Sequence, residues 1–379
     1  MDSWEKQQTQ FNDIKQMKEY SVENGVDEAA IEKQRIPFYG SMSKNKETTW
    51  VISLFVFVHL VAFFVTMIVN NCWNKSHGEC TFIFFQSLSE NPFLGPSSSG
   101  LDEMGALRRI FLTHKSGLWR LFTSPLLHAG VFHLFISLIS VLFIGINLEQ
   151  KVGSWRTGII YLFSAFTGSL AATLFVQNSP EVSSSAALFG LIGASVSELI
   201  RDWKSFSEKF LAVMTLVLVF AINFALGLLP HVDNFANIAG FVSGFLLGCA
   251  LIFSPQLRKP ALHKGLYDYG VKKSVALKDK LDRPVLRIVS LLLLILMVAG
   301  LIVAALRHTD ANKYCSWCRY IDCVPSRKWI CDIRAASCKT TEIRGQTTLR
   351  CLQSDKFKVL HFTGITPTRL EELCSVICS

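Results

Sequence analysis

Charged residues are scarce in this sequence and missing from long stretches of it. Lys, Arg, Asp and Glu make up 18% of the 379 residues, whereas half of the residues are hydrophobic and 29 are Phe. Such long charge-free runs exclude a chain of two or three soluble domains. Seven runs have close to the length of about 20 residues that a membrane span needs; they are 50–70, 121–147, 157–177, 184–200, 210–229, 234–254 and 287–306. The sequence therefore predicts an all-α, multi-pass membrane protein.

The sequence also lacks a nucleic-acid-binding patch, a visible cleavable signal peptide and a relay of charged residues within the spans. The basic residues behind the net charge of +9 fall mostly between the spans and form no patch interleaved with aromatic residues, so we expect them to set topology and expect no nucleic-acid partner. Residues 1–49 are polar and mixed in charge, which excludes a visible cleavable signal peptide and makes the first span a signal anchor. No charged relay lines the spans, which disfavours a transporter or receptor.

Cysteine is almost absent from the apolar runs and crowded outside them. Within the spans there is only Cys249, which is most simply a small packed hydrophobe. Ten cysteines are candidates for disulfides: Cys72, Cys80, Cys315, Cys318, Cys323, Cys331, Cys338, Cys351, Cys374 and Cys378. Eight of them lie in the tail, 307–379, and predict a disulfide-stapled mini-domain in an oxidising compartment. Zinc binding would need reduced thiols, so we expect no metal and no cofactor.

Span parity and the tail cysteines together predict the orientation in the membrane. With seven spans the termini lie on opposite sides, so a lumenal or extracellular tail places the extension 1–49 in the cytosol. The basic linker 255–286 is then cytosolic too, as the positive-inside rule requires. The glycosylation acceptor Asn74-Lys-Ser76 lies in the long first loop, 71–119, which becomes lumenal. We expect a secretory-pathway protein of the Golgi, endoplasmic reticulum or plasma membrane.

The run from Val182 to Ala194 is rich in Ser, Ala and Gly. Small residues let helices approach closely, so this run should lie at the centre of the bundle. It resembles the nucleophile segment of rhomboid intramembrane serine proteases, which reads Gly-x-Ser-Gly-x-x-Phe-Gly. The matching residues are Ser185, Phe189 and Gly190. Ser183 and Ala186 stand where the two other glycines belong. The resemblance makes Ser185 the nucleophile position.

A second rhomboid-like pattern, beginning at His128, opens the second span and contains His133 and Ser137. In rhomboids this pattern ends His-x-x-x-Asn, and the His and Asn donate hydrogen bonds to the oxyanion. The resemblance thus assigns His133 to the oxyanion site, with Ser137 one helical turn away on the same face. A hydroxyl is shorter than a carboxamide, so we expect one of the two donors to be degraded.

The sixth span begins Asp-Asn-Phe-Ala-Asn237, where rhomboids read Asp-Asn-x-Ala-His with the His as catalytic base. An Asn amide has no basic site at physiological pH, although it can hydrogen-bond to a hydroxyl without activating it. Loss of the His in a soluble serine protease lowers turnover by about 10⁶. The packing pattern survives, because Gly240 and Gly244 remain and can meet Gly190 and Gly193.

Two other histidines come into question as a base. His231 lies six residues before Asn237, roughly 9 Å away if helical, and on a different face. His133 should lie near Ser185, but as a donor to the oxyanion it is poorly placed to accept a proton. Another imidazole nitrogen within bonding reach of the Ser185 oxygen would overturn the interpretation as a scaffold, and the protein would have to be treated as a peptidase.

The resemblance covers residues 36–306. It implies a six-helix rhomboid-like core over 50–254 and a seventh helix over 287–306; the cysteine-rich tail resembles that of plant rhomboid-like proteins. The implied function is that of an inactive rhomboid-like protein that binds transmembrane client proteins in the bilayer and regulates their trafficking or stability. The alternative is an active rhomboid endopeptidase that uses Ser185 with an unconventional base. The oligomeric state stays open.

Overall fold

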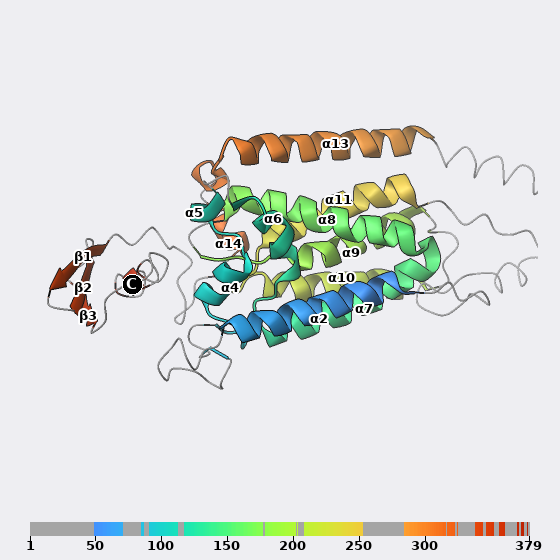
Figure 1. The fold of residues 1–379 in the computed structure, drawn as a ribbon. Coiled ribbons are helices and arrows are strands. Elements are labelled where there is room, and N and C mark those ends of the chain that lie inside the picture. Colours follow the sequence, from blue (N-terminus) through green and yellow to red (C-terminus); the bar gives the residue numbers. More distant parts are fainter. Residues whose placement is uncertain are drawn as a thin grey trace, which may run out of the picture.

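Long, roughly aligned helices make up most of the computed structural model (Figure 1). They are α2 (Val51–Asn70), α7 (Val131–Val152), α8 (Ser154–Phe175), α9 (Ser185–Arg201), α10 (Lys209–Leu226), α11 (Asn234–Leu251) and α13 (Pro284–Leu306). The structure describes residues 49–70, 85–86, 91–112, 117–176, 179–201, 203, 208–252, 284–315, 317–322, 324, 338–343, 346–351, 356–360, 370, 373–374 and 377.

Each predicted span overlaps one of these helices, and the helical membrane fold is confirmed. Within the described ranges, six helices are long and apolar enough to cross a membrane. The exception among the long helices is α9, which has 17 residues and buries fourteen of them. Its neighbours are α7, α8, α10 and α11, so the small-residue run does lie at the centre of the bundle.

The second span begins later than the sequence predicts. Residues 121–130 were expected within it, but α7 starts only at Val131 and runs on to Val152. The preceding residues form short turns, α6 (Arg120–Thr123) and the 3₁₀ turn η2 (Ser124–Leu126), in which Pro125 lacks the N–H that a continuing helix needs. Gly130 then passes close to the first loop, where a Cβ would lie 2.4 Å from the carbonyl oxygen of Phe93.

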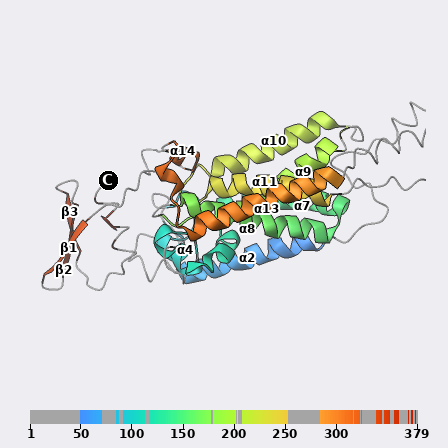
Figure 2. The same cartoon turned by 90° about the horizontal axis from the view of Figure 1, so that it is seen from above.

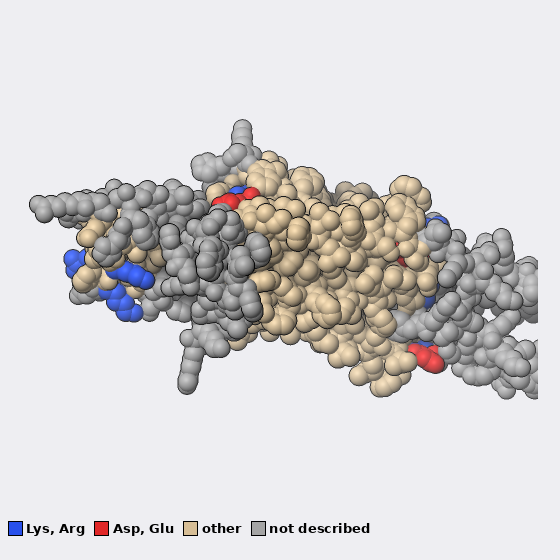
Figure 3. All heavy atoms as spheres, turned by 60° about the horizontal axis from the view of Figure 1, so that its bottom comes forward, with Lys and Arg blue, Asp and Glu red and all other residues tan. Residues whose placement is uncertain are grey.

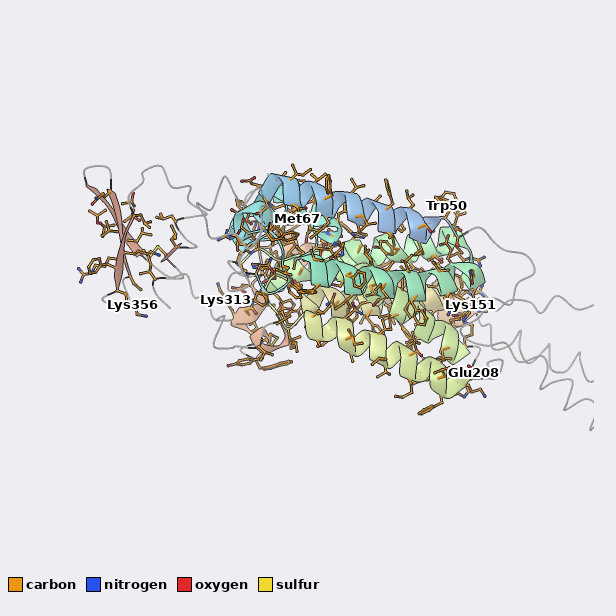
Figure 4. All side chains as sticks on the ribbon, turned by 90° about the horizontal axis from the view of Figure 1, so that it is seen from below. Trp50, Met67, Lys151, Glu208, Lys313 and Lys356 are labelled. Carbon is orange, nitrogen blue, oxygen red and sulfur yellow. A yellow bond between two sulfur atoms is a disulfide. The ribbon has the colours of Figure 1, made fainter. Side chains whose placement is uncertain are left out.

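The outer surface of the bundle is apolar between its ends. On the face shown in Figure 3, Lys, Arg, Asp and Glu gather at the two ends of the described region. Figure 4 places Lys151 and Glu208 at one end and Lys313 at the other. Exposed Leu, Ile, Val and Phe side chains cover the helices between them. This distribution fits a protein whose side surface faces lipid.

Helix α13 lies on the outside of the bundle, against α11 and α8 (Figure 2). It buries only Ser290 and Leu294 among its 23 residues. On the opposite side, α2 packs against α7. Its first turn is fixed by the buried Glu149 of α7, whose two carboxylate oxygens accept hydrogen bonds from the backbone N–H groups of Val51 and Ile52 at 3.0 and 3.1 Å. A carboxylate at a helix N-terminus is favourable, so Glu149 is a structural residue.

The end of the bundle where α13 ends and the tail starts, here called the tail end, is covered by short elements of the first loop. They are α4 (Ser98–Met104) and α5 (Arg109–Leu112). Leu107 exchanges two backbone hydrogen bonds with Glu181, just before α9. Arg120 is buried and donates to the carbonyl oxygens of Asp102 and Ala106, which fixes the loop against the helices.

The tail contains an antiparallel three-stranded sheet in the order β1 (Cys338–Ile343), β2 (Gln346–Cys351) and β3 (Phe357–Leu360). Disulfides join Cys315 to Cys318 and Cys338 to Cys374, and Cys351 is also disulfide-bonded. The prediction of a disulfide-containing tail is therefore confirmed, and Cys249 is a free thiol as expected. Several predicted residues lie outside the described ranges: Cys72, Cys80, Cys323, Cys331, Cys378 and Asn74.

Candidate active site

Ser185 and Asn237 lie on two helices whose starts are aligned by a short parallel backbone pairing. Val182 N donates to His231 O at 2.9 Å, and Asp233 N donates to Val182 O at 3.4 Å. Helix α9 therefore starts beside helix α11, with Ser185 as the first residue of α9 and Asn237 in the first turn of α11. Both side chains are buried. The backbone thus gives the nucleophile and base positions neighbouring places in the bundle.

The Ser185 hydroxyl has an imidazole partner. Nε2 of His133, from the first turn of α7, lies 3.1 Å from Oγ of Ser185. An imidazole nitrogen is therefore within bonding reach of the Ser185 oxygen, which is the arrangement that the sequence analysis gave as evidence for a peptidase. Distance does not say which atom carries the proton, so the other ring nitrogen decides the direction of the bond.

That second nitrogen, Nδ1 of His133, accepts a hydrogen bond from the backbone N–H of Ala129 at 3.3 Å. A neutral imidazole has one donor and one acceptor nitrogen, so an accepting Nδ1 places the proton on Nε2. Nε2 therefore donates to Ser185 and has no lone pair with which to take the hydroxyl proton. The opposite tautomer would leave the buried Ala129 N–H without an acceptor, at a cost of about 1–3 kcal/mol.

Asn237 is held by a different neighbour. Its Nδ2 donates to Oδ1 of Asn234 at 2.9 Å, while its own Oδ1 is buried and has no hydrogen-bond partner within the described ranges. The structure therefore shows Ser185 bonded to His133 and Asn237 bonded to Asn234. The amide that stands at the base position is turned toward its own helix.

The comparisons with known proteins agree with this architecture. Residues 115–254 match the Rhomboid domain. Over 343 residues the chain is 46% identical to Inactive RHOMBOID-like protein 8 of Arabidopsis thaliana, covering 88% of this chain and 97% of that protein. This chain belongs to the rhomboid family. It is also 42% identical to RHOMBOID-like protein 1 of the same plant over 334 residues, 87% of this chain and 85% of that one.

A rhomboid protein from an animal is similar as well. Over 214 residues the chain is 32% identical to Inactive rhomboid protein 1 of Danio rerio, which covers 56% of this chain and 22% of that protein. Together with the apolar helices, family membership makes the chain an integral membrane protein. Two of these three rhomboid relatives carry the word inactive in their names.

Ser137, which the sequence predicts as the second oxyanion donor, has a buried and unpaired hydroxyl in the described part of the chain. Ser137 follows His133 by one helical turn on α7. Oγ of Ser184, next to Ser185, is likewise buried without a hydrogen-bond partner among the described residues. Buried polar atoms are usually hydrogen-bonded, so unpaired hydroxyls beside the nucleophile position mark the place where a bound molecule would find partners.

The glycines of α9 and α11 lie where the two helices touch. A Cβ on Gly244 would lie 2.1 Å from the carbonyl oxygen of Gly190, and a Cβ on Gly240 would lie 2.2 Å from that of Ala186. A Cβ on Gly193 would lie 2.2 Å from the carbonyl oxygen of Phe241. Only glycine allows this separation, which brings the backbones of α9 and α11 into direct contact.

Two other histidines, His59 and His231, have hydrogen-bond partners of their own. Nδ1 of His59 donates to Leu126 O at 3.3 Å, so its Nε2 accepts from the Tyr161 hydroxyl at 2.7 Å. His59 is thus a bonded structural histidine, as expected for a lone His on a membrane helix. Nδ1 of His231 donates to Pro180 O at 2.9 Å. His231 therefore joins the segment before α11 to the segment before α9.

Sequence reasoning missed a hydroxyl network below the nucleophile. Oγ of Ser183 lies 2.9 Å from Oγ of Ser124 and 2.7 Å from Oγ of Ser169. Ser183 occupies the place of the first glycine in the rhomboid pattern, and these contacts satisfy its buried hydroxyl. The sequence does contain the two partners, Ser124 before α7 and Ser169 in α8. Their spacing along the chain does not predict that both lie beside Ser183.

Proposed function

We propose that this rhomboid is a pseudoprotease that binds the transmembrane helices of client proteins around Ser185 and alters their trafficking or stability. The observation that carries the proposal is the hydrogen bond from Ala129 N to Nδ1 of His133, from which we infer that Nε2 donates to Ser185. A serine attacks a peptide bond only when a neighbouring group takes its proton. Here the nearest imidazole donates, and the family's base position holds Asn237.

The unpaired polar atoms of the site support a binding role. Ser137 Oγ, Ser184 Oγ and Asn237 Oδ1 are buried without hydrogen-bond partners in the described part of the chain. A client helix that carries polar side chains brings groups that must find hydrogen-bond partners inside the bilayer. These hydroxyl and amide atoms offer such partners, and without a proton acceptor the client is held and not cut.

Helix α10 is the proposed side of entry for a client. Among its 18 residues it buries only Ala212, Leu216 and Asn223, so it has less packing to lose than the other helices that surround α9. Asn223 Nδ2 donates to Ser140 Oγ on α7 at 2.9 Å, which joins α10 to the helix that carries His133. Displacing α10 would open a path from lipid to Ser185.

The proposed orientation has residues 1–49 and the linker 255–286 in the cytosol and the tail in the lumen or outside the cell. The disulfides at Cys315–Cys318 and Cys338–Cys374 support an oxidising compartment for the tail. The basic linker supports a cytosolic location for the opposite end. A secretory membrane satisfies both conditions.

Site-specific photo-crosslinking in native membranes tests client binding. A photoreactive residue in place of Phe224, which faces Phe189 of α9 at a ring distance of 6.4 Å, is expected to give discrete adducts with membrane-spanning proteins. The matched control is the same residue in place of Leu296, which is exposed on α13 and should give a different pattern dominated by lipid. Identical adduct patterns from the two positions would overturn the proposal.

A further inference from the structure

Three carboxylates from distant parts of the sequence meet at the tail end of the bundle. Glu181 precedes α9, Asp233 precedes α11, and Asp322 ends the short helix α14 (Arg319–Asp322) in the tail. One carboxylate oxygen from each residue lies within 4.8 Å of the others. Glu181 and Asp233 are buried and Asp322 is partly buried, so these are not ordinary solvated surface acids.

The Asp233 carboxylate supplies an independent sign of a missing ligand. Its Oδ1 caps α11 by accepting from Ala236 N at 2.9 Å. Its Oδ2 is fully buried and has no hydrogen-bond partner within the described ranges. An unpaired carboxylate oxygen in the interior is costly, and such oxygens are normally paired or bound to a metal.

The third carboxylate brings the tail onto the bundle. Asp322 Oδ1 accepts from Asn234 N at the start of α11, and Asn234 Nδ2 donates to Ile321 O at 2.8 Å. Val324 N donates to Leu228 O at 3.2 Å, which holds the same tail segment to the turn after α10. Figure 1 shows α14 at this end of the helices. The carboxylate cluster therefore joins three segments of the chain: the segment before α9, the segment before α11 and the first part of the tail.

Burial changes the pKa values of two of these carboxyl groups. Burial raises the pKa of Asp233 to about 6, although hydrogen bonds from the backbone of Ala236 and Phe235 oppose the shift. Burial and the neighbouring carboxylates of Asp233 and Glu181 raise the pKa of Asp322 well above its ordinary value. Of the nearby charged groups, Arg109 pairs with Asp310 at 3.1 Å.

We infer that Glu181, Asp233 and Asp322 bind one Ca²⁺ ion that fastens the tail segment to the starts of α9 and α11. Oxygen-only ligands select a hard cation such as Ca²⁺. Ca–O bonds measure about 2.3–2.6 Å, so two ligands of one ion lie at most about 5 Å apart, and the three carboxylate oxygens all lie within 4.8 Å of one another. Sequence spacing predicts no metal here, because the three ligands are far apart along the chain.

A bound Ca²⁺ ion would also affect the candidate active site around Ser185 and Asn237. Asn234 connects the two, since its backbone N–H donates to Asp322 while its Oδ1 accepts from Asn237. Occupancy by Ca²⁺ holds the tail over the start of α11 and steadies the amide at the base position. The inference does not depend on client binding, because it concerns the tail end alone.

Thermal unfolding of the full-length protein in detergent tests the inference, with about 1 mM CaCl₂ compared with EGTA at pH 7.4. We expect Ca²⁺ to raise Tm by about 2–4 °C. Isothermal titration calorimetry should give one Ca²⁺ per chain. Glu181→Gln and Asp322→Asn keep the shapes of the side chains and are expected to abolish both the heat and the shift in Tm.

Asp310→Asn is the matched control, since Asp310 is a tail-end carboxylate paired with Arg109 and outside the cluster. This variant is expected to keep the full response to Ca²⁺. No response of the folded wild-type protein even at about 10 mM Ca²⁺ would overturn the inference and leave a shared proton as the bridge between the carboxylates. A response that survives in the Glu181→Gln, Asp322→Asn double variant would also overturn it, as non-specific binding.

Discussion

His133 donates a hydrogen bond to Ser185, with Nε2 3.1 Å from Oγ. The direction follows from a contact one helical turn away, because the Ala129 N–H occupies the acceptor nitrogen of the same ring. One backbone amide thus decides whether the imidazole nearest to the nucleophile position can serve as a base. In this rhomboid it serves as a donor.

Removing His133 should destabilise the fold. In His133→Ala the Ala129 N–H loses its acceptor and Ser185 loses its donor, and each buried group left unpaired costs about 1–3 kcal/mol. Thermal unfolding in detergent should show a Tm several degrees lower. His133→Gln can both accept and donate, so it should lose less; equal Tm values for wild type and His133→Ala would contradict the described contacts.

Substitution of Gly244 tests the contact between α9 and α11. Gly244→Ala places a Cβ 2.1 Å from the carbonyl oxygen of Gly190, so the helices must separate, at a cost of about 1–3 kcal/mol. Gly300→Ala on α13 is the control, since its Cβ meets nothing within 4 Å and alanine favours a helix by up to about 1 kcal/mol. In thermal unfolding we expect the Tm of Gly300→Ala to equal or exceed that of wild type. The Tm of Gly244→Ala should be well below it.

Stability without calcium should depend on pH around the carboxylate cluster. The pKa of Asp233 is raised from 3.8 to about 6 by burial, so between about pH 4 and pH 6 the folded state binds more protons than the unfolded state. In EGTA, Tm should therefore increase as the pH falls from 7.5 to about 5. His231 lies two residues away and is a second ionisable residue beside the cluster.

Asp233→Asn separates these two groups. Asparagine is a good N-cap, so the variant keeps the start of α11 while removing the titrating carboxylate. The increase in Tm toward low pH should be smaller in this variant than in wild type. An unchanged pH profile would assign the effect to His231 or to another group.

Restoring the rhomboid residues should create activity. Asn237→His puts an imidazole at the base position, and Ser137→Asn lengthens the second oxyanion donor. Because a base contributes about 10⁶ and one oxyanion donor about 10²–10³ in related sites, the double variant should cleave a generic rhomboid substrate in liposomes while wild type does not. Ser185→Ala in the same background must abolish that cleavage; a folded but silent double variant would show that the aligned positions are wrong.

The sequence predicted the spans because they depend on local patterns, whereas the roles of the site residues rest on motif matches and stay predictions. Apolar runs locate the helices, and the motif around Ser185 locates the start of α9. The start of the second span was predicted too early. The apolar composition extends back to residue 121, but Pro125 and the close contact of Gly130 with Phe93 delay the start of α7 to Val131.

Long-range placement was beyond the sequence. The tautomer of His133 depends on the direction of the Ala129 N–H, and the hydroxyl partners of Ser183 come from other segments of the chain. The meeting of Glu181 with Asp322 spans most of the second half of the chain. None of these relationships has a spacing signature, because each arises from how the helices pack.

Reactivity of the Ser185 hydroxyl tests the central claim most directly. Purified wild type, Ser185→Ala and the Asn237→His, Ser137→Asn variant would be incubated with a fluorophosphonate probe at neutral pH, and covalent labelling measured by in-gel fluorescence. We predict labelling of the restored variant only, with wild type no brighter than Ser185→Ala. Labelling of wild type that disappears in Ser185→Ala would show that the hydroxyl loses its proton in the native site and would contradict the account.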